Sequence, residues 1–252
     1  MPGKPTTLSK ANIVWGIRAF LWNTPLLQPA YNVYLAARYR GPHSTLVTRT
    51  SDVCIEAFPR SANTFMVQSL RLSTDRPIEI AHHLHSPLQI ERSVKLGIPV
   101  VVILRNPIDC YTSFKIKTPQ LSVEVMHRAY FRFHEKALRH AKDIHLVRYD
   151  DVITNTGKVI AQLHRWIGSG DEMVGAFDKN AVFKAIDEVK EQREGSRTLS
   201  DAKRFATTLA RPTAEKEAAK HAVRAQIEQQ YPELAASADR LYRQLLAQCV
   251  NI

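Results

Sequence analysis

CIEAFPRSANTF, residues 54–65, begins like a buried strand and changes to a helix-like pattern after its Pro-Arg-Ser. A chain that leaves a strand and enters a helix presents unpaired backbone N–H groups and the positive end of the helix dipole, which together bind anions such as phosphate. Arg60 adds a fixed positive charge with several donors. The stretch lacks the G-x-x-x-x-G-K-[ST] spacing of ATP-binding P-loops. It therefore predicts a phosphate-binding loop of another kind at the end of a strand.

The segments around this loop predict strands that alternate with helices. Residues 99–104 form a short apolar run rich in β-branched side chains, typical of a strand buried on both faces, and residues 144–148 indicate another strand. After each of these strands apolar residues recur at helical spacing, at Met126, Tyr130, Phe133, Ala137 and Ala141 and at Val159, Ile160, Leu163, Trp166 and Ile167. The alternation predicts an α/β fold with a central parallel β-sheet flanked by helices on both faces.

The two ends of the chain are predicted to be helical. Residues 188–211 are charged and weakly periodic, which indicates a basic loop or lid, and helices follow over residues 213–230 and 232–248. With 252 residues and a hydrophobic fraction of 44%, the chain can bury a sizeable core without a second independent domain. We expect a helical extension over residues 1–50 that packs on a main domain of residues 51–252.

The charge balance points to anionic partners. Lys and Arg number 35 against 24 Asp and Glu, which gives a formal net charge of +11. The sequence contains no zinc-ligand spacing, RNA-binding sheet signature or basic heptad region, so we expect no nucleic acid among the partners. Its cysteines are Cys54, Cys110 and Cys249, an odd number placed far apart. This pattern argues against a disulfide framework and predicts a reducing, cytoplasmic setting.

An apolar segment over residues 13–39 is interrupted by Arg18, Pro25 and Pro29. A membrane-spanning helix needs roughly 20 consecutive apolar residues, so we expect this segment not to cross a membrane. Two short amphipathic helices that pack on the domain, or on the partner subunit of a homodimer, are the first expectation. Peripheral contact with a membrane surface is the alternative.

Two further motifs lie near the predicted ligand edge of the sheet. Arg105 leaves the second strand and Ser113 follows eight residues later, a spacing that can bring both onto one anion. His82, His83 and His85 lie upstream of the same strand. Histidine is the natural general base for a hydroxyl acceptor at neutral pH. No cluster has clear metal-ligand spacing, so we expect no metal.

The phosphate loop resembles that of the sulfotransferases that use 3′-phosphoadenylyl sulfate (PAPS). Their loop is close to Y-P-K-S-G-T-T-W, with F-P-R-S-G-N-T-F in bacterial members, and this chain has F-P-R-S-A-N-T-F. The resemblance implies a P-loop NTPase-like sulfotransferase fold in which Arg60 takes the role of the family's lysine. It places around the 5′-phosphate Arg60, Ser61, Ala62, Asn63, Thr64 and Phe65. Ala62 stands where the family has glycine, the residue that tolerates every backbone conformation.

The other motifs are similar to elements of the same family, as is VRYDDV at residues 147–152. The family's 3′-phosphate motif has an arginine eight residues before a serine, which implies that Arg105 and Ser113 bind this phosphate. Its C-terminal R-K-G loop has a weak counterpart in Arg193-Glu194-Gly195. By this likeness Arg193 and Arg197 are assigned to the nucleotide as well.

The family's K-T-H-x-P element carries its catalytic histidine. Aligned on the proline, His85-Ser86-Pro87 matches and His85 is the base. Aligned by distance to the arginine, His83 takes this place. We expect His85, with His83 as the alternative.

The resemblance implies transfer of a sulfuryl group from PAPS to a hydroxyl or amine acceptor, with 3′-phosphoadenosine 5′-phosphate (PAP) as product. The acceptor is a small molecule, a lipid or a glycan. Two other functions remain open: a nucleotide kinase or NTPase, and a nucleotide-binding module without catalysis. The first is disfavoured because the loop lacks Gly-Lys-Thr.

Overall fold

The sheet at the centre of the protein is built from strands that are buried on both faces. In the computed structural model every residue of β3 (Val53–Ala57) and β5 (Val100–Leu104) is buried. Continuous burial is typical of parallel strands covered by helices on either side. The other strands are β1 (Arg40–Gly41), β2 (Ser44–Thr45), β4 (Ile80–His82) and β6 (His145–Arg148). The structure describes residues 9–38, 40–41, 44–168, 177–194 and 214–250.

The strands follow the order β1-β2-β4-β3-β5-β6 in one sheet. β4, β3, β5 and β6 are parallel, with Ile55 opposite both His82 and Val101 and with Val102 opposite Leu146. This confirms the predicted α/β class with its central parallel sheet. β1 and β2 add an antiparallel edge next to β4. The sequence did not indicate this edge, because strands of two residues show no alternation of apolar and polar side chains.

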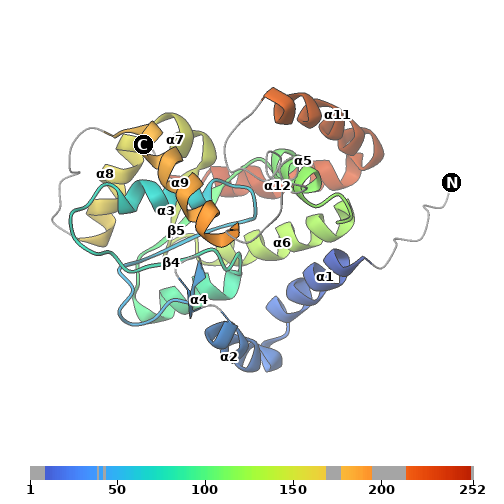
Figure 1. Ribbon diagram of the computed structural model, residues 1–252. Coiled ribbons are helices and arrows are strands. Elements are labelled where there is room, and N and C mark those ends of the chain that lie inside the picture. The colour runs from blue at the N-terminus through green and yellow to red at the C-terminus, as the bar shows by residue number, and fades with distance from the viewer. Residues whose placement is uncertain (1–8, 39, 42–43, 169–176, 195–213, 251–252) are drawn as a thin grey trace.

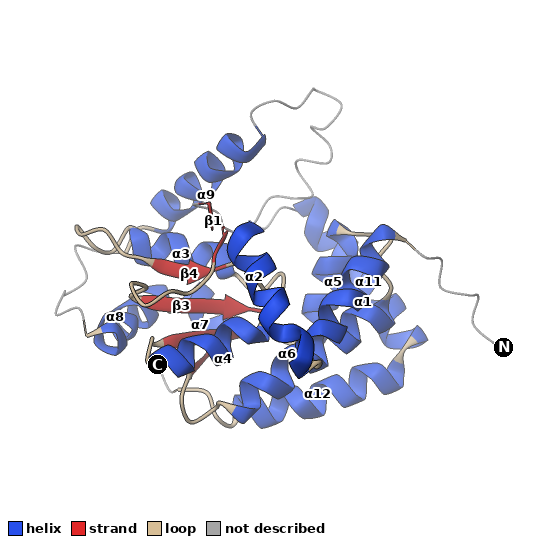
Figure 2. Cartoon of the chain, turned by 90° about the horizontal axis from the view of Figure 1, so that it is seen from below, coloured by secondary structure: helices blue, strands red, loops and turns tan. Residues whose placement is uncertain are grey.

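Helices cover both faces of the sheet (Figure 1). Alternate residues of each central strand point to opposite faces, so Cys54, Val100 and Val102 join one core cluster while Ile55, Val101 and Ile103 join the other. The first cluster includes residues of α1 (Lys10–Trp22), α2 (Gln28–Arg38), α4 (Pro87–Leu96), α5 (Pro107–Lys117), α6 (Val123–Arg139), α11 (Ala214–Gln230) and α12 (Pro232–Leu246). The second includes residues of α3 (Asn63–Arg71), α7 (Tyr149–Thr154), α8 (Thr156–Ile167) and α9 (Lys179–Glu194). Figure 2 shows these layers from below.

The N-terminal helices contribute to the first of these clusters. Ala19 and Trp22 of α1 and Tyr31 and Leu35 of α2 are buried, and the short 3-10 helix η1 (Pro25–Leu27) joins the two helices. The C-cap of α1 is Asn23, one residue after Trp22. None of the helices in the described ranges is both long and apolar enough to cross a membrane.

The prediction of a basic loop over residues 188–211 is wrong for its first residues, 188–194. α9 continues as a helix to Glu194. Val182 and Ile186, one helical turn apart, are buried, and α9 packs against α3, which anchors the helix before its highly charged last two turns. Charged and polar residues such as Glu, Lys, Arg and Gln have good helix propensity and continue a helix that is anchored in this way. Residues 195–211 of the predicted loop lie outside the described part of the chain.

Candidate functional site

Three loops that follow neighbouring parallel strands meet at one edge of the sheet. β4, β3 and β5 lie side by side. They lead into the histidine loop (residues 83–86), the phosphate loop (residues 58–62) and Arg105, respectively. The carboxyl ends of the strands are where α/β sheets bind their ligands. The fold therefore brings the three sequence motifs together.

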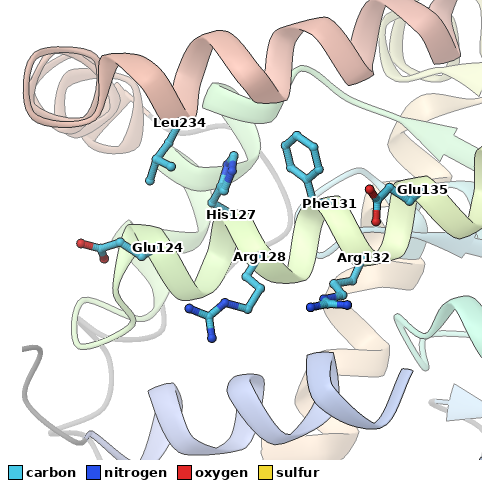
Figure 3. A pocket seen from close by; sticks show the side chains of 7 residues that line it. All are labelled: Glu124, His127, Arg128, Phe131, Arg132, Glu135 and Leu234. Carbon is cyan, nitrogen blue, oxygen red and sulfur yellow. The ribbon is translucent and has the colours of Figure 1, made fainter. Parts of the chain in front are cut away.

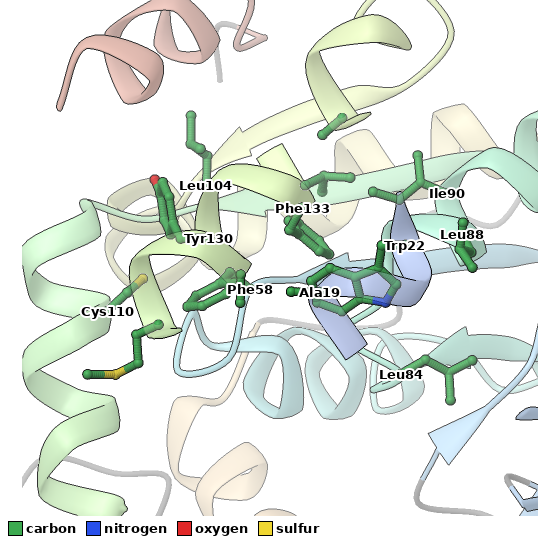
Figure 4. Packing of buried hydrophobic residues seen from close by; sticks show 14 of the residues in the cluster. Ala19, Trp22, Phe58, Leu84, Leu88, Ile90, Leu104, Cys110, Tyr130 and Phe133 are labelled. Carbon is green, nitrogen blue, oxygen red and sulfur yellow. The ribbon is translucent and has the colours of Figure 1, made fainter. Parts of the chain in front are cut away.

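Phe58 anchors the phosphate loop in the core. Its side chain is fully buried, and its ring meets those of Tyr130, Phe114 and Phe133 at centroid distances of 5.2, 6.2 and 6.3 Å. All three pairs are edge-to-face, the arrangement that aromatic rings prefer. Figure 4 shows Phe58 beside Tyr130 and Phe133. The residues that follow, Pro59 and Arg60, thus leave from a fixed point.

The backbone of the two loops is strained. Arg60, Ala62, His83 and His85 have φ angles of 74°, 62°, 61° and 48°, and within the described ranges no other residue except glycine has a positive φ. Each such residue costs on the order of 1–3 kcal/mol unless its surroundings compensate, and strain of this kind concentrates at functional sites. Ala62 therefore adopts the left-handed conformation that a glycine would take most easily.

The N-terminus of α3 follows directly on the strained loop. Its N-cap, Ala62, makes no capping hydrogen bond with its side chain. The side chains on either side face inward: Ser61 Oγ lies 3.3 Å from Cys110 Sγ, Asn63 Nδ2 donates to the carbonyl of Ile55 at 3.2 Å, and the Phe65 ring lies 5.6 Å from that of Phe183. Because these side chains face inward, the groups available to bind an anion here are the backbone N–H groups at the positive end of the helix.

Two guanidinium groups lie beside this helix end. Arg60 Nε donates to Ser113 Oγ at 3.1 Å, and Arg105 donates through Nη1 to the carbonyl of Arg60. The Arg105 guanidinium also lies 4.2 Å from the centroid of the Tyr149 ring. Burial lowers the pKa of Arg60, and the charge of Arg105 lowers it further. No ion pair in the described part of the chain involves either arginine, so the two charges together attract an anion.

His85 is held as a neutral base. Its Nδ1 lies 2.8 Å from the carbonyl oxygen of Ala57. Because a carbonyl only accepts, Nδ1 carries the proton and Nε2 has the lone pair. Burial lowers the pKa of His85 from 6.5 to about 4. The Ala57 hydrogen bond opposes this shift, while nearby positive charges add to it, those of Arg18, Lys117 and Arg60.

His83 belongs to a chain of hydrogen bonds instead. Arg71 Nη2 lies 3.3 Å from His82 Nε2, the two Nδ1 atoms of His82 and His83 are 2.6 Å apart, and His83 Nε2 lies 2.8 Å from Thr64 Oγ1. Arginine can only donate, so with both rings neutral each histidine accepts from the previous group and donates to the next. The lone pair of His83 then faces His82, and its proton is donated to Thr64.

A buried carboxyl group supports the histidine loop from beneath. Glu56 in β3 is fully buried, and its Oε1 accepts from the backbone N–H of Leu84 and from Gln89 Nε2, both at 2.9 Å. Burial raises the pKa of Glu56 from 4.5 to about 8, although these hydrogen bonds oppose the shift. Sequence reasoning missed this residue. The signal was present as a single glutamate inside an otherwise apolar strand.

Substitution of Glu56 by glutamine should remove a pH-dependent loss of stability. Between pH 4.5 and 8 the folded state holds a proton that the unfolded state releases, so the free energy of unfolding falls as pH rises. From pH 5 to pH 8 the wild-type protein should lose about 3 kcal/mol through this group. Glutamine keeps the accepting oxygen but does not titrate. Urea unfolding of both proteins at pH 5 and pH 8 tests this. The prediction is contradicted if the unfolding free energy of Glu56→Gln, taken relative to wild type, is the same at pH 8 as at pH 5.

Helix α1 also reaches the site, which no local sequence pattern indicated. Arg18 Nη2 donates to the carbonyl of Leu84, between the two loop histidines. The ring of Trp15 lies 5.2 Å from that of Phe114 and 6.3 Å from that of Phe58. Phe114 follows Ser113, and Phe58 begins the phosphate loop. α1 thus contacts all three parts of the site.

Other predicted site residues are not placed here. Arg193 lies in the last turn of α9, where the structure describes the backbone alone, and Arg197 lies outside the described residues. Nor do the described ranges contain a group of three or more His, Cys, Asp or Glu side chains that could hold a metal ion. A pocket on the outer face of α6 is lined by none of the predicted residues (Figure 3) but by Glu124, His127, Arg128, Phe131, Arg132, Glu135 and Leu234.

Comparison with solved structures gives a distant likeness. The mouse sulfotransferase SULT7A1 complexed with PAP matches 78% of this chain and 90% of the mouse chain, with a TM-score of 0.45 and 12% sequence identity. No protein-family model matches the chain, and no curated protein matches it either. At this level of likeness the mouse enzyme carries no argument about the reaction.

Proposed function

We propose that the protein transfers a sulfuryl group from PAPS to a hydroxyl or amine acceptor. The observation that carries the proposal is the pair formed by Arg60 and Arg105, which lies at the N-terminus of α3 and beside Ser113. In the described part of the chain no carboxylate forms an ion pair with either arginine. Such a group fits a ligand with more than one phosphate-like anion. The F-P-R-S-A-N-T-F motif and the Arg105–Ser113 spacing support PAPS as that ligand.

The reaction needs a base on one side of the sulfur and positive charge on the other. The acceptor oxygen or nitrogen forms a bond to sulfur while the bond between sulfur and the 5′-phosphate oxygen breaks. His85 takes the acceptor proton at Nε2. Arg60 and the N–H groups at the start of α3 stabilise the charge that develops on the departing phosphate. Positioning and electrostatic stabilisation provide most of the catalysis in such transfers.

Binding of PAP in preference to ADP tests the nucleotide assignment. ADP carries both phosphates at the 5′ position, whereas Arg105 and Ser113 are proposed to hold a 3′-phosphate. A ligand at a hundred times its dissociation constant stabilises a protein by about 2.7 kcal/mol, and for a chain of this size this raises the melting temperature by roughly 5–10 °C. We expect such a shift with PAP and little shift with ADP or ATP, with or without magnesium.

Arg105→Ala should erase most of this preference, because an arginine contact to phosphate is charge-assisted and often bidentate. Arg139→Ala is the matched control, since Arg139 is exposed at the end of α6, outside the proposed site. Equal shifts from ADP and PAP in the wild type would reject the sulfotransferase proposal and favour a general nucleotide-binding or NTPase function. A PAP-specific shift without any release of PAP from PAPS, over a panel of alcohols, phenols and amines, would indicate a binding module without catalysis.

A further inference from the structure

The outward faces of α1, η1 and α2 are unusually apolar. Ile17, Phe20 and Leu26 have 54%, 61% and 91% of their surface exposed. Apart from Leu72, every large hydrophobic residue that is exposed in the described part of the chain lies in this segment: Ile13, Val14, Ile17, Phe20, Leu26, Leu27, Val33 and Tyr34. Exposed apolar groups that gather on one surface, unlike scattered ones, mark an interaction site.

This face is not the packing face of the helices. α1 already buries Ala19 and Trp22 in the core. Ile13, Ile17 and Phe20 are spaced by four and three residues, so they form a second apolar stripe on the same helix. A helix that is apolar on both sides is normally buried on both sides. The second stripe therefore calls for a partner.

The charge of the segment indicates which partner. The first 51 residues contain none of the 24 Asp and Glu but six of the 35 Lys and Arg, so more than half of the formal net charge of +11 falls in this fifth of the chain. The six are Lys4, Lys10, Arg18, Arg38, Arg40 and Arg49. Apolar and aromatic side chains combined with basic ones, in the absence of acidic ones, are the composition of helices that lie on anionic membranes.

We propose that the exposed face of α1, η1 and α2 docks onto an anionic lipid surface. The apolar side chains enter the boundary between headgroups and acyl chains, while the positive charge of the segment attracts the lipid phosphates. Arg18 takes no part in this attraction, because its guanidinium is turned inward to the carbonyl of Leu84. A second copy of the chain suits this face less well, because a two-fold interface brings the same surface against itself. Two acid-free, basic segments would then face each other and repel. The docking proposal concerns binding alone and holds whichever reaction the candidate site performs.

Sedimentation of the full chain with vesicles tests the proposal. We expect binding to vesicles of phosphatidylserine mixed equally with phosphatidylcholine, and much weaker binding to phosphatidylcholine alone. Each basic residue near such a surface contributes about fivefold to partitioning. Binding should also weaken from low salt to 1 M salt, where the Debye length falls to about 3 Å.

Phe20→Ser combined with Leu26→Ser should reduce binding at least tenfold, since full burial of one such side chain in an apolar medium contributes roughly tenfold or more. Both residues are mostly exposed, so the variant should remain folded. Leu72→Ser is the matched control, because Leu72 is 50% exposed but lies at the end of α3. Equal binding by the double variant and the wild type would overturn the proposal. A wild type that ignores vesicles and forms a dimer, which the double variant loses, would assign the face to a second copy instead.

Discussion

His85→Ala should abolish measurable sulfuryl transfer while the folded protein still binds PAP. A general base contributes roughly 10²–10⁴-fold to the rate. Because His85 Nδ1 donates its proton to the Ala57 carbonyl, the lone pair that can accept a proton is on Nε2. The measurement is the release of PAP from PAPS with the fastest acceptor of a panel of alcohols, phenols and amines. The rise in melting temperature caused by PAP should differ from that of wild type by no more than a few degrees, because the base lies on the acceptor side of the sulfur.

A second substitution separates loss of the base from loss of the fold. His85 has a left-handed backbone conformation, and asparagine adopts this conformation more easily than alanine. The amide of His85→Asn can donate to the Ala57 carbonyl but cannot take a proton at neutral pH. We expect it to be as inactive as His85→Ala and at least as stable. Activity near wild type in His85→Asn would exclude proton transfer by this residue.

The pH profile gives an independent check on the same base. With a pKa of about 4, His85 is unprotonated from about pH 5 upward, so its titration should not limit kcat/KM across the neutral range. The rate should fall only as the pH approaches 4 and the ring becomes protonated. A rate that instead halves near pH 6.5 would indicate a histidine in an ordinary environment.

His83→Ala should have the smaller effect, because the lone pair of His83 accepts from His82 and its proton is donated to Thr64. The expected loss comes from the altered position of Thr64 at the start of α3. An inactive His83→Ala with an active His85→Ala would reverse the two assignments and favour the alignment by distance to Arg105.

The sequence was sufficient for β3, β5 and β6 and for helices such as α6, but not for β4 or α9. β3 and β5 are buried on both faces, so β5 appears as a continuous apolar run and β3 as an apolar run interrupted only by Glu56. The buried face of α6 repeats at helical spacing, and four of its five predicted residues, Met126, Tyr130, Phe133 and Ala137, are buried in the helix. The fifth, Ala141, lies past the end of α6 and is partly buried. β4 has three residues, one of them a histidine, and β2 has two. Segments this short carry no period from which a strand could be recognised.

The site was predictable where it depends on chain direction and not where it depends on contacts between distant segments. Arg60 and Ser113 were expected at the same edge of the sheet, and Arg60 Nε does lie 3.1 Å from Ser113 Oγ. The contact from Arg18 to the Leu84 carbonyl joins residues 66 positions apart, and neither residue belongs to a recognisable motif. The hydrogen bond between Thr64 and His83 likewise depends on the left-handed backbone conformation of His83, which the residue type does not predict.

Arg60→Ala should lower turnover about 10²–10³-fold, the usual loss on removal of one well-placed electrostatic donor, and should lower PAP affinity far less. The charge of Arg60 is needed most when the bond to sulfur breaks and negative charge develops on the leaving phosphate. The substitution removes the guanidinium but keeps the backbone carbonyl to which Arg105 donates. Arg105 therefore remains in place, and the variant isolates the side chain of Arg60.

Arg60→Lys distinguishes charge from geometry at this position. Lysine keeps a positive charge but lacks the Nε donor that contacts Ser113 at 3.1 Å. We expect turnover between those of wild type and Arg60→Ala, with PAP and ADP affinities changed alike by both substitutions. Single-turnover and steady-state rates, compared with PAP binding, measure the two effects separately. If Arg60→Ala reduces turnover less than about threefold, well short of the usual loss, the charge that stabilises the leaving phosphate must come from Arg105 and the backbone N–H groups of α3 alone.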